Sequence, residues 1–430
     1  MVSRLVLVSS ALVVGLGAST AAVRPDSNNE RTELAQAPAA ASAADNPMTG
    51  QIPGVGAPDI PTTDHDVMKD LMPSWDCVSG VCGQPAPVGQ VVGAFRFICR
   101  HTNLANDDPT VLPGRPGVSH LHDQTGVYGW DAYSNYRRLR TGGGGSGCND
   151  VAGTDHNPAE RNWAANRTPY WQPALLDGKG NVILADYTSF YYKRRPADDP
   201  VVSDPSAPRY QGRAVPLPNG LKFLFGGHPE NPSLATDPHA NVTFGCIDPA
   251  GHPDPRSDAR DMRADLRCAQ QPGYWFEVRA GAPDCWDGVH LDMPDHRSHM
   301  SYPQDTHLGY TKCDSAHPFV VPTFTYAAFY TIMPTDDPTL IHFSSDEADR
   351  ARPQGWSFHV DYGPASWDPV VLKMWTDNCI NKLLNCTGGD LGNGKQLKGA
   401  SKPYYYSDGA WVTAWHIPKR LVPIPAMHGM

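Results

Sequence analysis

Proline and glycine interrupt this chain so often that long helices are excluded. The 430 residues include 42 Pro and 40 Gly. Pro lacks the backbone N–H and clashes inside a helix, and Gly has a high entropic cost there. Of the acidic residues, 39 are Asp and only 6 are Glu, and Asp favours turns and caps whereas Glu favours helix interiors. The composition predicts short strands joined by loops and argues against a helical bundle, a coiled coil or a (β/α)₈ barrel.

The N-terminal residues 1–22 have the pattern of a secretory signal peptide. Arg4 precedes an apolar run from Leu5 to Leu16, and small residues follow up to Ala22. A membrane anchor is the alternative, but the run is too short to span a bilayer comfortably. We therefore predict a secreted, extracellular protein without a membrane span after cleavage. The net charge of −10, with no Lys/Arg run, argues against a nucleic-acid partner.

The ten cysteines all follow this segment, and their even number predicts up to five disulfides in an exported chain. A zinc–thiolate site is the alternative, but no CxxC motif occurs. Spacing leaves the connectivity open. The pairing that we expect is Cys77–Cys82, Cys99–Cys148, Cys246–Cys268, Cys285–Cys313 and Cys379–Cys386.

The chain divides into a leader and one domain. Residues 23–70 are rich in Ala, Pro, Asn, Asp and Gly without periodic hydrophobicity, which predicts a disordered leader. Residues 71–430 are expected to form a single secreted domain. A helix is predicted only from Pro369 to Asn385, with Asp368 as its N-cap. Strands are predicted at Val91 to Cys99, Asn181 to Tyr192, Leu221 to Phe225, Val242 to Ile247, Tyr274 to Val278, Phe319 to Tyr330, Leu340 to Phe343 and Ser357 to Val360.

These patterns favour a mostly β fold, a β-sandwich or jelly-roll-like single domain with long disulfide-stapled loops and little helix.

Histidine and aspartate gather in four segments: Ser119 to Asp123, Cys285 to Pro303, Cys313 to Pro318 and Gly355 to Tyr362. In extended backbone, His120 and His122 point to one side, and His359 and Asp361 share a face of the last segment. Dense ionisable groups are typical of sites with tuned pKa values. The alternatives are hydrogen-bonded loop histidines, a calcium-binding or structural loop, and an amphipathic strand with a hydrated face.

The order of the motifs SHLHD, CWDG, DHRSHMSYP, CDSAHP and GWSFHVDY resembles the secreted domain-of-unknown-function family nineteen-ninety-six (DUF1996) of fungi and actinobacteria. The resemblance extends from about Phe95 to Gly394. It implies no established activity. Because relatives often carry carbohydrate-binding modules, it suggests work on extracellular or cell-wall polysaccharide.

Three functions compete. The first is a glycan hydrolase, in which two carboxylates act as acid and base and Trp286, Arg297, Tyr302 and Trp356 bind the sugar. The second is a metal-dependent oxidoreductase or hydrolase with copper or zinc, in which Asp361 or Asp123 adds an oxygen ligand. The third is a non-catalytic glycan- or cell-wall-binding protein. The candidate acid and base residues are Asp123, Asp287, Asp292, Asp295 and Asp361. The candidate metal ligands are His120, His122, His296, His299, His317 and His359.

Convergence separates these functions, because an enzyme needs its ionisable groups in one concave pocket. We predict that the six histidines and Asp361 lie within one pocket.

Overall fold

The computed structural model describes residues 59–60, 65–74, 85–142, 145–148, 165–229, 241–398 and 421–425. The predicted signal peptide and most of the predicted leader therefore lie outside the described residues. All described residues belong to one compact unit, residues 40–430. Within this part of the chain no helix has both the length and the apolar character needed to cross a membrane.

The larger of the two main sheets has six strands in the order β11-β12-β18-β8-β2-β21. Its strands are β11 (Val242–Ile247), β12 (Trp275–Gly281), β18 (Thr323–Tyr330), β8 (Tyr187–Arg194), β2 (Gly93–Cys99) and β21 (Asn385–Cys386). All neighbours are antiparallel except β2 and β21. The expected strands at these positions are confirmed, with boundaries shifted by a few residues. The predicted strands Asn181 to Tyr192 and Phe319 to Tyr330 are each divided, because Asn181–Ile183 and Phe319–Val320 pair in smaller sheets.

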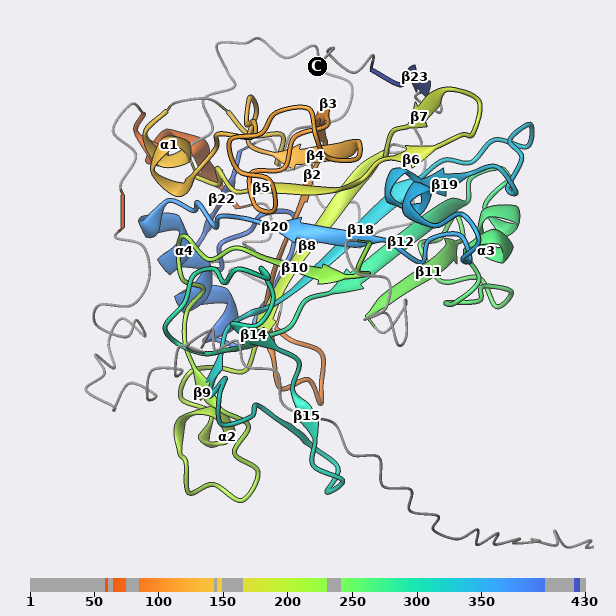
Figure 1. The fold of residues 1–430 in the computed structure, drawn as a ribbon. Helices are drawn as coiled ribbons and strands as arrows, with labels where there is room; N and C mark the ends of the chain where they lie inside the picture. Colours follow the sequence, from red (N-terminus) through yellow and green to blue (C-terminus); the bar gives the residue numbers. More distant parts are fainter. Residues whose placement is uncertain are drawn as a thin grey trace, which may run out of the picture. The chain divides into compact units, whose positions relative to one another are not determined.

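The second main sheet has five antiparallel strands in the order β10-β20-β5-β4-β3, and Figure 1 shows these strands together. They are β10 (Phe223–Gly226), β20 (His359–Tyr362), β5 (Pro169–Pro173), β4 (His122–Gly126) and β3 (His101–Ala105). Sequence reasoning assigned no strand to β3, β4 or β5. Pro at both ends of β5 and the polar HDQTG sequence of β4 hide their strand character, because both strands are buried by tertiary packing.

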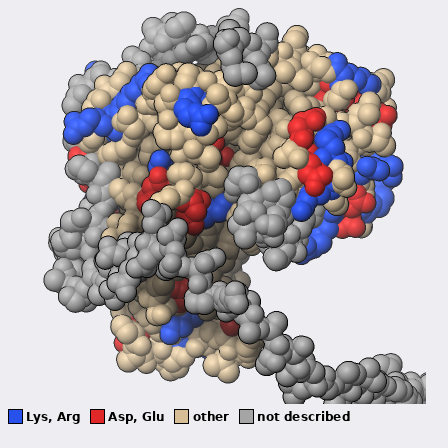
Figure 2. Space-filling model, in the orientation of Figure 1, with Lys and Arg blue, Asp and Glu red and all other residues tan. Residues whose placement is uncertain are grey.

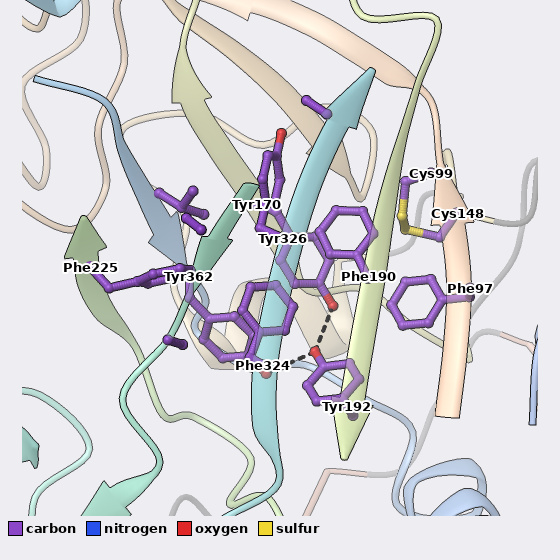
Figure 3. Close-up of a cluster of buried hydrophobic side chains, with 14 of the residues drawn as sticks. Phe97, Cys99, Cys148, Tyr170, Phe190, Tyr192, Phe225, Phe324, Tyr326 and Tyr362 are labelled. Atoms are coloured by element: carbon purple, nitrogen blue, oxygen red, sulfur yellow. Dashed lines mark hydrogen bonds between the residues drawn. A yellow bond between two sulfur atoms is a disulfide. The ribbon is translucent and has the colours of Figure 1, made fainter. Parts of the chain in front are cut away.

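An aromatic core lies between the two main sheets (Figure 3). The ring of Tyr170 on β5 is 4.3 Å from that of Phe190 on β8, and the ring of Tyr362 on β20 is 4.7 Å from that of Phe324 on β18. The hydroxyl of Tyr192 joins those of Tyr170 and Tyr362 through hydrogen bonds of 3.1 Å each, so these buried polar atoms are satisfied. The prediction of a mostly β single domain is confirmed, and the two sheets pack as a sandwich.

The described residues also form smaller sheets. They have the orders β1-β22, β14-β13-β17-β9, β15-β16 and β19-β6-β7-β23. Their strands are β1 (Leu71–Pro73), β22 (Lys395–Leu397), β14 (Met300–Ser301), β13 (Cys285–Trp286), β17 (Phe319–Val320), β9 (Arg213–Ala214), β15 (Gln304–Asp305), β16 (Thr311–Lys312), β19 (His342–Phe343), β6 (Leu175–Leu176), β7 (Asn181–Ile183) and β23 (Leu421–Pro423).

Helices are short throughout the described residues, as the Pro and Gly content requires. The helical segments are η1 (Val67–Asp70), α1 (Tyr136–Thr141), α2 (Pro200–Ser203), α3 (Met262–Cys268), η4 (Ser344–Ala348), α4 (Pro369–Trp375) and η5 (Thr376–Ile380). The carboxylate of Asp368 caps α4 by accepting the N–H of Val370, as expected. The predicted helix is too long, because the chain leaves helical geometry after η5 and Cys379 is tied to Cys386 on β21.

Four of the five expected disulfides are confirmed: Cys99–Cys148, Cys246–Cys268, Cys285–Cys313 and Cys379–Cys386. The fifth expected pair, Cys77–Cys82, lies outside the described residues. At the N-terminal side, η1 precedes β1, which pairs with β22. The segment η1 therefore lies within the last residues of the predicted leader.

Candidate metal centre

The outer face of the five-stranded sheet, away from the aromatic core, presents two histidines at one level. His122 on β4 pairs with Pro173 on the central strand β5. On the other side of β5, Asp361 of β20 pairs with Trp171, so His359, two residues earlier, lies at the level of Pro173. Alternation along antiparallel strands then directs His122 and His359 to the same face.

His120 completes a cluster of three imidazoles. It precedes β4 by two residues, and its ring lies 4.2 Å from that of His122 and 5.1 Å from that of His359. One nitrogen from each ring lies within 4.8 Å of the others. We call His120, His122 and His359 the three-histidine cluster.

Backbone carbonyls determine which nitrogen faces inward. His122 Nδ1 lies 3.1 Å from the carbonyl oxygen of Asp107, and His359 Nδ1 lies 2.8 Å from that of Ser357. A carbonyl only accepts, so both Nδ1 atoms carry a proton, and Nε2 of the neutral His122 keeps its lone pair. The Nε2 atoms of His120 and His122 are buried and have no hydrogen-bond partner among the described residues. A buried lone pair without a donor is suited to an electrophilic ion.

Two of the three histidines are held in the neutral state that metal ligands require. Burial, with the neighbouring His359 acting in the same direction, lowers the pKa of His122 to about 3. Burial also lowers the pKa of His120 well below its ordinary value, with His122 and His359 acting in the same direction. A cation therefore does not compete with protons for these nitrogens near neutral pH.

Zinc lies 2.0–2.1 Å from each histidine nitrogen in proteins, so tetrahedral ligands are about 3.3 Å apart. The cluster's nitrogens, all within 4.8 Å of one another, would need to close by at most about 1.5 Å. The donor set therefore fits a three-histidine ion site with a further ligand position.

A cavity of about 320 Å³ opens over His120 and His359. Its wall also carries two carboxylates that sequence reasoning missed, Asp108 and Glu347. Asp108 is buried and accepts the N–H groups of Thr110 and Val111 at 2.9 and 2.8 Å. Burial raises the pKa of the Asp108 carboxyl, and those hydrogen bonds only partly oppose the rise.

The carboxylate of Glu347, unlike that of Asp108, is exposed to solvent. The side chain of Glu347 is 57% exposed, and its Oε1 lies 2.7 Å from Nε2 of His342. One signal pointed to Asp108, since the sequence DDP stands just before the first histidine segment. Glu347, one of six Glu residues, stands in no histidine-rich motif.

A family model described as a domain of unknown function (DUF1996) matches residues 108–367, which is more than half of the chain. The chain belongs to this family. The DUF1996 match begins at Asp108 and includes the three-histidine cluster and Glu347. It is narrower than the expected range of about 95–394. No curated protein and no solved structure matches the chain.

The two remaining aspartates near the cluster have different positions. Asp361 is buried, and its Oδ2 lies 3.6 Å from Nε2 of His359, so the structure brings this carboxylate to the cluster. Asp123 alternates with His122 on β4 and points into the space between the sheets. There its Oδ1 lies 2.6 Å from Nδ1 of His101. Asp123 therefore does not share the cavity of the three-histidine cluster.

The structure does not bring the other three candidate metal ligands, His296, His299 and His317, into the three-histidine cluster. His296 Nδ1 lies 2.8 Å from Asp292 Oδ1. His317 uses both ring nitrogens, with Nδ1 2.9 Å from Asp314 Oδ1 and Nε2 2.9 Å from the carbonyl oxygen of Ser298.

His299 lies on the side of β10 opposite to the cavity over the three-histidine cluster. Its Nε2 donates to the carbonyl oxygen of Lys222 at 2.9 Å, and its ring packs 6.5 Å from that of Phe223, which belongs to the aromatic core. Leu224, the next residue along β10, lines the cavity on the opposite face. The prediction that all six histidines share one pocket is therefore wrong. The loop from Cys285 to Pro303, the 290s loop, is anchored at the edge of the sheet beyond β10.

The remaining candidate carboxylates stabilise their own loop. Asp287 accepts the N–H groups of Val289 and His290, and Asp295 accepts those of Arg297 and Ser298. Asp292 contacts Lys222 Nζ at 2.9 Å. Burial opposes its ionisation, but hydrogen bonds from His296 and Lys222 outweigh burial and lower the pKa of Asp292.

The four expected sugar-binding residues are also tied to the protein interior. Trp286 and Trp356 are buried, and Trp286 donates to the carbonyl oxygen of His290. The hydroxyl of Tyr302 donates to the carbonyl oxygen of Gly281, and Arg297 donates to that of Gly227. Neither tryptophan exposes a ring face on which a sugar could stack.

Proposed function

We propose that this protein is a secreted metal-dependent hydrolase that acts on extracellular or cell-wall polysaccharide. The single observation that carries the proposal is the convergence of one nitrogen from each of His120, His122 and His359 within 4.8 Å. Four disulfides among the described residues support export to an oxidising compartment.

A hydrolytic role follows from what surrounds the cluster. A zinc ion held by the three histidines would supply a Lewis acid that activates water, and the buried carboxylate of Asp361 would lie beside it. Asp108 and Glu347 line the cavity over the cluster, and their environments differ. The exposed Glu347 is suited to accept a proton from attacking water, whereas the buried Asp108, with its raised pKa, is suited to deliver a proton to the leaving group.

Metal content tests the proposal directly. The secreted protein is stripped with a chelator, reloaded with zinc or copper(II), and assayed for bound metal by mass spectrometry. We expect one ion per chain in the wild type and none in His122→Ala or His359→Ala. His307→Ala is the matched control, because that imidazole is 90% exposed. A wild-type protein that takes up neither metal stoichiometrically would refute the site.

Activity is then measured on cell-wall polysaccharides as released reducing ends and released carboxylic acid. Zinc should restore the activity of the stripped wild type and leave His122→Ala inactive. If copper(II) with oxygen restores activity and zinc does not, the reaction is an oxidation and not a hydrolysis. A protein that binds polysaccharide but turns over none of it would be a non-catalytic binder.

One observation favours a second candidate, glycoside hydrolysis without a metal. Asp108 and Glu347 line one cavity in unlike environments, as an acid and base pair requires. In that case the chelated protein stays active and Glu347→Gln abolishes activity, while Asp305→Asn, which changes a carboxylate that is 68% exposed, has no effect.

A further inference from the structure

A second, larger cavity of about 540 Å³ borders the one over the three-histidine cluster. Asp108 lines the cavity of the cluster, and the next residue, Pro109, lines the second cavity. The same alternation recurs at Leu112 and Pro113. The segment 108–114 therefore contributes to the walls of both cavities.

The two cavities also approach one another where β10 begins. Leu224 of β10 lines the first cavity, and Lys222, which immediately precedes β10, lines the second. Two residues of chain cover at most about 7 Å, so the linings of the two cavities lie close together at this point.

One residue couples this wall to the cluster. The carbonyl oxygen of Asp107 accepts from His122 Nδ1, and its carboxylate accepts the N–H groups of Gly117 and Ala132 at 2.9 and 3.2 Å. Ala132 and Tyr133 line the second cavity. The position of that wall is thus fixed relative to a ring of the three-histidine cluster.

The chemistry of the second cavity is aromatic and polar without net charge. Tyr133 is 55% exposed, and its ring lies beside Gly114 across the cavity wall. The ammonium of Lys222 is paired with Asp292 at 2.9 Å, and the amide of Asn135 is used to cap α1 by accepting the N–H of Arg138. Figure 2 shows acidic and basic side chains next to one another in the region where Figure 1 labels β10. A polyanion finds no unpaired cation among these lining residues.

We propose that the two cavities form one elongated substrate site that binds a neutral oligosaccharide, with Tyr133 stacking on a sugar ring and the three-histidine cluster at the far end. Stacking suits the apolar face of a sugar, and the ion pair of Lys222 and Asp292 suits its hydroxyl groups. The inference rests on the proposed function for the reaction, but binding in the second cavity does not require the ion.

Binding is measured calorimetrically on the metal-free full-length protein with cellohexaose, laminarihexaose and chitohexaose, and with hexagalacturonate as the charged probe. We expect at least one neutral hexasaccharide to bind, Tyr133→Ala to weaken it about tenfold, and Tyr133→Phe to retain it. Leu308→Ala is the control, since that exposed side chain belongs to neither cavity.

The inference is overturned if no neutral hexasaccharide binds at millimolar concentration, if Tyr133→Ala binds as well as the wild type, or if hexagalacturonate binds more tightly. Failure of the proposed function looks different. A protein that binds the hexasaccharide through Tyr133 but takes up no zinc or copper would leave the second cavity intact and remove the metal centre.

Discussion

Acid should destabilise the metal-free protein through His122. This side chain is fully buried, and burial lowers its pKa from 6.5 to about 3. Between those values the unfolded chain binds a proton at His122 and the folded chain does not. The free energy of unfolding therefore falls as the pH is lowered through this window and is fully recovered above pH 6.5.

The magnitude follows from the shift. One proton of difference changes the free energy of unfolding by about 1.4 kcal/mol per pH unit. Over the full shift of His122 the loss reaches about 5 kcal/mol, and about 2 kcal/mol of it falls between pH 7 and pH 5. His120 adds a loss of the same sign, because burial lowers its pKa as well.

Urea unfolding of the metal-free protein, at steps of half a pH unit from pH 7 to pH 5, measures this loss in the free energy of unfolding. The matched variant is His122→Asn, whose amide can still donate to the carbonyl oxygen of Asp107 but does not titrate. We expect the wild type to lose about 2 kcal/mol more than His122→Asn over this range. Equal slopes in both proteins would show that His122 is solvated or already charged, and would refute the argument that burial prepares the cluster for an ion.

Three further predictions concern the ion and its support. Zinc at a hundred times its Kd should raise the free energy of unfolding of the wild type by about 2.7 kcal/mol, seen as a rise in Tm that is absent in His359→Ala. Asp107→Ala should weaken zinc binding about tenfold in a competition assay with a chelating dye, and unchanged affinity relative to the exposed control Asp305→Ala would show that the Asp107 carboxylate does not position His122. Replacing Cys285 and Cys313 by Ser opens a loop of 28 residues and should cost about 3–4 kcal/mol of stability in denaturant unfolding. Zinc affinity should remain in that variant, because the loop supplies no member of the cluster.

Sequence patterns predicted correctly those features that depend only on neighbouring residues in the chain. Two histidines separated by one residue in extended backbone point to the same side, and the rings of His120 and His122 lie 4.2 Å apart. The same alternation placed His359 and Asp361 together. The cap of α4 by Asp368 depends only on its neighbours in the chain and was likewise predictable.

The convergence of histidine segments was not predictable from such patterns. His122 and His359 meet because Pro173 on β5 lies between them in the sheet, and β5 has no strand signature of its own. The density of histidine and aspartate in the 290s loop suggested an active site. Its groups instead form short pairs within the loop, such as Asp287 with His290, which stabilise a segment rich in turns.

The sequence by itself determined the class of protein. Frequent Pro and Gly, many more Asp than Glu, and ten cysteines in the chain permit little besides short strands, long loops and disulfides, since each of these residues acts on the backbone where it stands. Only the tertiary structure decided which three histidines form the candidate metal centre and that Asp108 and Glu347 share its cavity. Those groupings depend on strand pairing between distant segments and on which face of a sheet becomes buried, and neither is encoded in the spacing of residues along the chain.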